Sequence, residues 1–331
     1  MELHTTVSIP QAGFSFSYRD ELMLLGSCFA EEMGHKLCAD KFRVDVNPFG
    51  TLYNPASIAA SLRRLLQPEP FAASDLFEGE GRYHSFAHHS RFSRPSAAEA
   101  LEGINRQLAL SAAKLRSCTR LILTWGTAYA YRLRSDGQIV ANCHKLLDKL
   151  FERERLRLEE IVSEWEALLL TLWEQNPGLC VLFTLSPIRH WKDGAHPNQL
   201  SKATLLLAID ALQRLHPERI AYFPAYELMM DELRDYRFYA DDMLHPSSLA
   251  ADYICERFYG SFLSGESQTL LGEWQAIRKA IAHKPFQPGG EAYRRFILQT
   301  LLKAERLTEK FPFFELTKEI AYLRSEGQVK K

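Results

Sequence analysis

The chain has 331 residues, enough for a substantial core and, by length alone, for about two domains. Hydrophobic residues make up 46% and charged residues 24%, with a net charge of -1, so the composition is that of a globular protein with no general attraction to nucleic acid or acidic membranes. No apolar run has the length of a membrane-spanning helix, and the first twenty residues lack the pattern of a secretory signal, so we expect a cytoplasmic protein.

A short apolar run at residues 21–26 predicts a buried strand. Apolar residues at helical spacing then predict a helix over 28–40. Ser27 stands at the turn between them, where helix-terminal N–H groups favour negative charge. A serine in this position can attack a carbonyl if a base reaches it.

Four further apolar runs predict buried strands at 42–46, 120–125, 179–185 and 220–223. Helical patterns lie between and after them, at a segment opened by Asn54-Pro55 and at 96–113, 155–175, 199–215, 227–235 and 247–263. Regular alternation of strands and helices predicts an α/β fold, a three-layer α/β/α sandwich around a five-stranded, mostly parallel sheet. The carboxyl ends of these strands share one edge, where open α/β sheets bind ligands.

Three segments depart from this alternation. Residues 5–9 suggest an edge strand, residues 67–95 lack any period and predict a surface excursion, and residues 128–142 predict a β-hairpin from their Ser-Asp-Gly turn.

Beyond about residue 264 the strands end, and helices are expected at 269–283 and 291–310. We therefore expect an α/β catalytic domain over 1–264 and a helical extension over 265–331 packed on it. The tail from Arg324 is expected to fray.

A partner for Ser27 lies far downstream, in Asp242-Met243-Leu244-His245-Pro246. An acid three residues before a histidine can orient the imidazole, and the proline keeps the ring in a loop. Ser27, His245 and Asp242 thus form a candidate nucleophile, base and orienting acid. Asp241 is the alternative acid.

These motifs resemble a known family. Gly26-Ser27-Cys28-Phe29-Ala30 is similar to the name-giving motif of the GSCFA family, and Asp242-x-x-His245-Pro246 resembles the last sequence block of the related SGNH hydrolases. Other similar stretches lie at 47–50, 124–128, 141–145 and 186–190. The resemblance spans about residues 20–260 and implies a flavodoxin-like fold and an esterase or acyltransferase without a cofactor.

The resemblance also places Ser27 at the nucleophile position. The adjacent Cys28 is the alternative, since a helix start stabilises a thiolate. The six cysteines contain no C-x-x-C pair, and most lie in apolar segments as buried free thiols do.

An acyl-transfer site needs two or three donors aimed at the oxyanion. Backbone N–H groups of Ser27, Gly50 and Gly126 are candidates, although the two glycines are equally explained by tight turns. SGNH enzymes commonly use the asparagine of a G-x-N-D block as the third donor, and this chain lacks that block. Asn142 or Thr127 could replace it.

Substrate-binding candidates follow the strand ends or lie in the excursion. A positive cluster there would suit phosphate, carboxylate or sugar hydroxyls, and ordinary surface charge is the alternative. The candidates are His144, Lys145, Arg189, His190, Tyr83 and Phe86. The neighbouring histidines His84, His88 and His89 lack an acid partner at ligand spacing, so we expect no metal.

The leading hypothesis is a serine esterase or acyl hydrolase acting on an ester of a small molecule or carbohydrate. Ser27 attacks, His245 takes and returns the proton, and Asp242 holds the imidazole. The alternatives are an acyltransferase that uses the same triad to acetylate a sugar and an inactive binding module. The sequence leaves the substrate and the oligomeric state open.

Overall fold

A computed structural model describes residues 5–285 and 290–327. Its central sheet has five parallel strands in the order β10-β9-β5-β1-β2. The strands are β1 (Glu21–Gly26), β2 (Arg43–Val46), β5 (Arg120–Trp125), β9 (Cys180–Leu185) and β10 (Ile220–Phe223). Read from β2, this is the 2-1-3-4-5 order of flavodoxin-like sheets, so the predicted fold class is confirmed.

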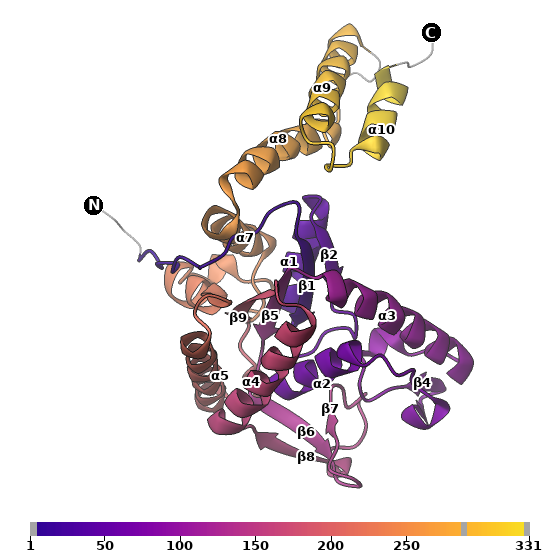
Figure 1. The fold of residues 1–331 in the computed structure, drawn as a ribbon, viewed down its shortest axis with the longest axis vertical. Coiled ribbons are helices and arrows are strands. Elements are labelled where there is room, and N and C mark those ends of the chain that lie inside the picture. The colour runs from indigo at the N-terminus through magenta and orange to yellow at the C-terminus, as the bar shows by residue number, and fades with distance from the viewer. Residues whose placement is uncertain (1–4, 286–289, 328–331) are drawn as a thin grey trace.

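Both faces of the sheet are covered, because alternate side chains of each strand enter different cores. Met23 and Leu25 of β1 pack in one core, and Leu22 and Leu24 pack in the other. The first core includes α2 (Pro55–Leu66), α3 (Ala97–Ser117), α4 (Leu158–Gln175) and α5 (Ala195–Leu215). The second includes α1 (Cys28–Ala39) and α7 (Ser248–Phe262), and Figure 1 shows the resulting layers.

The excursion and the hairpin are more regular than expected. The excursion contains the strand pair β3 (Phe77–Gly79) and β4 (Arg82–His84). The predicted hairpin is β6 (Tyr129–Leu133) and β7 (Ile139–Val140), and β8 (Phe151–Arg155) adds a third strand against β6. Sequence reasoning missed β8, whose charged residues resemble the start of the helix that follows it.

The amino-terminal segment was predicted wrongly, because residues 5–9 form no strand. The segment is held further along instead, where Phe16 bridges Leu263 at the end of α7. The side chain of Phe16 is fully buried among Phe258 and Phe262.

The predicted helical extension is present as α8 (Gly265–Ile281), α9 (Glu291–Lys310) and α10 (Thr317–Gly327), which follow α7. In place of the helix predicted at 227–235, the chain forms the short α6 (Ala225–Glu227) and then a π-helix at Leu228–Glu232. Helix α10 was not predicted, and it includes the start of the tail expected to fray; residues 328–331 lie outside the described part. The Trp274 indole donates to the Ala39 carbonyl at 3.1 Å, and Tyr18 stacks on Phe42 and meets Phe314 edge-on. These contacts join the C-terminal helices to the second core.

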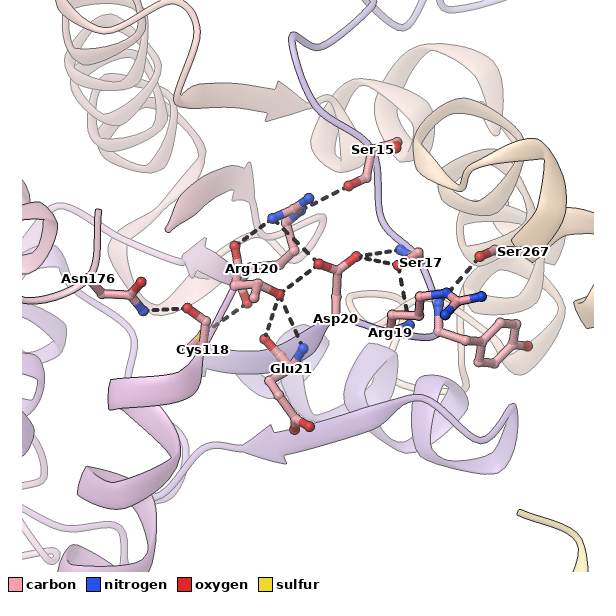
Figure 2. A network of polar contacts seen from close by, with 11 residues as sticks. Ser15, Ser17, Arg19, Asp20, Glu21, Cys118, Arg120, Asn176 and Ser267 are labelled. Atoms are coloured by element: carbon pink, nitrogen blue, oxygen red, sulfur yellow. Dashed lines mark hydrogen bonds and ion pairs between the residues drawn. The ribbon is translucent and has the colours of Figure 1, made fainter. Parts of the chain in front are cut away.

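The amino ends of β1 and β5 are joined by a polar network around Asp20 (Figure 2). Its carboxylate accepts from the Ser17 N–H at 2.6 Å and from the Thr119 hydroxyl at 2.7 Å, with the Arg120 guanidinium at 3.5 Å. Because this network lies at the edge opposite the strand ends that carry the candidate site, its role is to hold the fold.

Candidate active site

The turn after β1 requires glycine. Gly26 has a φ of +149°, and a Cβ there would lie 2.2 Å from the Thr124 carbonyl oxygen of β5. Its N–H donates to the Asn47 side-chain oxygen at 2.9 Å, which ties the turn to the end of β2. The close approach of β1 to β5 and the hydrogen bond to the Asn47 side chain together fix the position of the next residue, Ser27.

That next residue, Ser27, is the N-cap of α1. Its Oγ accepts from the Phe29 N–H at 3.3 Å, and its own N–H donates to the Thr124 carbonyl at 3.2 Å. The residue is almost fully buried at the carboxyl edge of the sheet. A hydroxyl therefore lies where the positive end of a helix favours negative charge.

His245 is held by a compact loop. Its Nδ1 lies 2.5 Å from Oδ2 of Asp242, whose Oδ1 accepts the N–H groups of Leu244 and His245 at 2.9 Å each. The backbone of the loop is stapled by the N–H of Ala240, which donates to the His245 carbonyl at 2.8 Å. The N–H of His245 and then that of Leu244, followed by the imidazole, lower the pKa of Asp242 to about 2, so its carboxylate is ionised at neutral pH. No contact from Asp241 to the ring is present among the described residues.

Ser27 and His245 line one cavity of about 580 Å³. Both residues therefore meet at the same edge of the sheet, although they come from opposite ends of the α/β part of the chain. No hydrogen bond joins Ser27 Oγ to the imidazole within the described residues, and the ring is about half exposed. Five other predicted site residues also line this cavity: Thr127, Asn142, Lys145, Arg189 and His190.

The backbone N–H groups predicted as oxyanion donors already donate to carbonyl groups of the fold. The Gly50 N–H donates to the Asn47 carbonyl at 2.7 Å, and those of Gly126 and Thr127 donate to the Tyr53 carbonyl at 2.8 and 3.0 Å. These N–H groups, like that of Ser27, have partners within the fold. For Gly50 and Gly126, which are not among the cavity-lining residues, the structure agrees with the tight-turn alternative.

Three substrate-binding candidates lie away from this cavity. His144 turns inward, with Nε2 2.9 Å from the Ser85 carbonyl. Phe86 stacks on Phe77, and Tyr83 pairs with Arg94 through the backbone. Tyr83 and Phe86 belong to the excursion and His144 packs against it, and none of the three lines the cavity that contains Ser27.

Comparison with known proteins agrees with the motifs. The sequence model of the GSCFA family matches residues 21–258, more than half of the chain. The chain belongs to the GSCFA family. A second model, described as the GSCFA domain protein, C-terminal domain, matches residues 274–328. No curated protein matches the chain.

Two solved structures are similar to parts of this chain. One is a Streptococcus pneumonia protein provisionally described as a platelet activating factor, with 11% identity, coverage of 74% of this chain and 84% of that chain, and a TM-score of 0.39. The other is an acetyl xylan esterase, Est2A, from the rumen bacterium Butyrivibrio proteoclasticus, with 12% identity, coverage of 73% and 63%, and a TM-score of 0.33.

The helix start does not lower the pKa of the cysteine in the GSCFA motif. Burial raises the pKa of the Cys28 thiol, and this effect outweighs the lowering by the N–H groups at the helix start. The stabilised thiolate on which the Cys28 alternative depended is therefore not supported by this environment.

Two of the predicted cations are neutral. Burial, together with Lys202, Arg153 and His245, lowers the pKa of His190 to about 4, and burial also lowers the pKa of His144. The positive charge on the cavity wall therefore comes from lysine and arginine.

Sequence reasoning missed Asn54, which lines the cavity beside Ser27. Its side-chain oxygen caps α2 by accepting the Ser57 N–H at 2.8 Å, so the NH2 of the amide is left for another partner. Asn142 is arranged alike, since its oxygen accepts the His144 N–H at 2.8 Å. The pair Asn54-Pro55 signalled only a helix start, and nothing in its spacing pointed to the cavity.

The described residues show neither a membrane span nor a metal site. None of their helices combines the length and apolar character needed to cross a membrane. They also contain no group of three His, Cys, Asp or Glu side chains placed to hold a metal ion. His84 and His88 bond to Ser93 and Ser85 within the excursion. A separate cavity of about 660 Å³ lies between α1, α7 and α8 and contains none of the predicted site residues.

Proposed function

We propose that this GSCFA protein is a serine esterase that cleaves an ester of a small molecule or carbohydrate through an acyl-enzyme. The observation that carries the proposal is the common cavity of Ser27 and His245, with Asp242 bonded to the far nitrogen of the ring. A hydroxyl, an imidazole and an orienting carboxylate are the three groups that such chemistry needs.

In this mechanism Ser27 Oγ attacks the ester carbonyl while Nε2 of His245 takes its proton. The tetrahedral oxyanion is stabilised by the free amide NH2 groups of Asn54 and Asn142, because the backbone N–H groups nearby already have partners. The imidazolium then returns the proton to the leaving alcohol. Water, activated by the same ring, releases the acid and restores Ser27.

Attack requires Ser27 Oγ and the imidazole to come within hydrogen-bond reach, so the His245 loop must move when substrate binds. The loop is exposed at Met243, and catalytic hydrogen bonds tighten when substrate binds. An acyltransferase would use the same groups, with a sugar hydroxyl in place of water.

A fluorophosphonate probe tests the proposal, because it labels only an activated serine. The wild-type protein is expected to be labelled at Ser27, and Ser27→Ala and His245→Ala are expected to be unlabelled. Equal labelling of wild type and Ser27→Ala would reject Ser27 as the nucleophile.

A binding module without catalysis is the second candidate. The committed backbone N–H groups and the missing hydrogen bond between Ser27 and His245 favour it. The two candidates differ in one result: a binding module leaves all three proteins unlabelled while still binding its ligand in the cavity.

A further inference from the structure

Arg189 follows β9 and stands where two hollows meet. Together with Trp191 it lines both the cavity that holds Ser27 and an adjoining hollow of about 550 Å³. The adjoining hollow is lined by apolar and aromatic side chains such as Met230, Tyr236 and Tyr239, and its charged residues besides Arg189 are Arg234, Asp235 and Asp242. A ligand bound at Ser27 that extends along the surface in this direction would pass the guanidinium.

This arginine differs from three arginines that are paired with buried carboxylates. Arg153 pairs with Asp193, Arg257 with Glu232 and Arg278 with Asp40, and each of these carboxylates is almost fully buried. In contrast, Arg189 forms no ion pair with any described residue.

The Nε atom of Arg189 is also buried and has no hydrogen-bond partner among the described residues. A buried donor without a partner is costly, so each one in a native fold needs an explanation, and a bound ion or ligand is one such explanation. The fold therefore leaves the Nε–H of a guanidinium without a partner at the junction of the two hollows.

A second basic side chain lies behind the cavity wall, and it is only partly charged at neutral pH. Lys202 on α5 is fully buried, and its amine donates to the Ser186 carbonyl at 2.8 Å without an ion pair in the described part of the chain. Burial lowers the pKa of Lys202 to about 7, with Cys28 and Glu227 acting in the other direction. Glu227 instead accepts the Tyr222 hydroxyl at 2.8 Å.

The wall of the Ser27 cavity also has more basic than acidic side chains without ion pairs. Lys145 and Lys192 line it without ion pairs among the described residues, and the only carboxylates on its wall are Asp148 and the already paired Asp193. The pKa of His190 is lowered by burial and then by the nearby Lys202 and Arg153, as expected in a positive environment.

We infer that the ligand of this cavity carries an anionic group, a carboxylate or a phosphate, which Arg189 binds beside the ester. The inference rests on the proposed function in that it takes the same cavity as the substrate site. It names the substrate class as esters bearing a second, negatively charged group. Arg189 then determines specificity and does not take part in bond making or breaking.

A matched pair of esters tests the inference kinetically. The wild-type protein is expected to have a higher kcat/KM for the mono-4-nitrophenyl ester of glutaric acid than for 4-nitrophenyl butyrate, which lacks the carboxylate. In Arg189→Gln this preference should fall on the order of tenfold or more, as expected for a lost charge-assisted contact. Arg189→Lys, which keeps the charge without the planar fork, should fall in between. The control Arg116→Gln changes an exposed arginine of α3 and should keep the wild-type preference.

A binding measurement separates failure of this inference from failure of the proposed function. Ser27→Ala protein is titrated by calorimetry with inorganic phosphate and with glutarate, with and without Arg189→Gln. Saturable binding of either anion, weakened on the order of tenfold by Arg189→Gln, supports the inference even if no ester is hydrolysed, and it shows which anion is preferred. No saturable binding of either anion, or equal binding by both proteins, overturns it, as does an ester preference that survives in Arg189→Gln.

Thermal midpoints distinguish a loss of anion binding from a loss of stability in Arg189→Gln. Because Arg189 has no carboxylate to leave behind, Arg189→Gln is expected to melt no lower than wild type. A variant that melts well below wild type while losing anion binding would instead make Arg189 a structural residue and overturn the assignment.

Discussion

The Nδ1 atom of His245 lies 2.5 Å from Oδ2 of Asp242, and the other oxygen of that carboxylate holds the backbone of the same loop. One side chain thus fixes both the position of the histidine and the orientation of its ring. The pair is exposed, so its importance is expected in the reaction and not in the stability of the fold.

Asp242→Asn is expected to lower ester hydrolysis on the order of a hundredfold to ten-thousandfold, because the amide favours the wrong tautomer of the ring. The thermal midpoint should change little. Esterase rates and melting curves measured side by side with Asp241→Asn check this, since Asp241 does not contact the ring. Equal losses in the two variants would show that general negative charge, and not the contact to Nδ1, is what matters.

Cys28→Ser is expected to retain fluorophosphonate labelling and hydrolysis, because burial raises the pKa of the Cys28 thiol and keeps it protonated. Labelling intensity, read on a gel beside wild type, provides the measurement. If labelling disappears in Cys28→Ser and persists in Ser27→Ala, Cys28 and not Ser27 is the nucleophile.

Asn54→Ser and Asn142→Ser remove the amide NH2 while keeping an oxygen that can cap α2 or accept the His144 N–H. Each variant is expected to keep its fold and to lose on the order of a hundredfold in kcat, the usual effect of removing an oxyanion donor. Steady-state kinetics with a neutral ester check this. A variant with unchanged kcat would remove that asparagine from the oxyanion site.

Gly26→Ala is expected to prevent correct folding or to lower stability by about 3 kcal/mol or more, because its Cβ would overlap the Thr124 carbonyl. Gly103→Ala is the matched control: a Cβ there meets nothing within 4 Å on α3, and alanine is a better helix former. Soluble yield and urea unfolding of both proteins give the comparison. Wild-type stability in Gly26→Ala would show that β1 and β5 can separate at this point.

The stability of the wild-type protein relative to Lys202→Met is expected to rise with pH. Burial lowers the pKa of Lys202 to about 7, while the unfolded chain has its ordinary value near ~10.4. Between these values the unfolded state binds more protons, so the free energy of unfolding of the wild type gains about 3 kcal/mol from pH 7 to 9.5. The variant lacks this term. Urea unfolding at both pH values measures the difference, and parallel changes in the two proteins would mean that Lys202 titrates normally.

Local patterns were sufficient to predict the sheet and the helices that cover it. Strands β1, β5 and β9 are short runs buried on both faces, and helices with apolar stripes follow β1 and β9. Strand β8 was missed because its Glu-Arg alternation is largely exposed, so no apolar period marks it. The same reasoning fails for residues 5–9, whose apolar side chains pack on the second core without pairing as a strand.

The candidate site was predicted in its residue types but only partly in its geometry. Ser27, Asp242 and His245 stood out because their motifs contain unusual combinations at the ends of predicted elements. The oxyanion donors could not be identified in this way. Whether a backbone N–H is free depends on carbonyls that approach from distant turns, as the Tyr53 carbonyl approaches Gly126. Arg189 was named, but its lack of a carboxylate could not be read from a sequence.

The turn that presents Ser27 is held by partners from β5 and from the loop after β2: Thr124 accepts its N–H, the Asn47 side chain accepts the Gly26 N–H, and the Gly26 carbonyl accepts the Leu52 N–H. The loop with His245 is synthesised much later than any of these. A ribosome-bound chain can therefore complete the cradle of the serine well before the imidazole emerges, so reactivity can be acquired only near the end of translation of the α/β part.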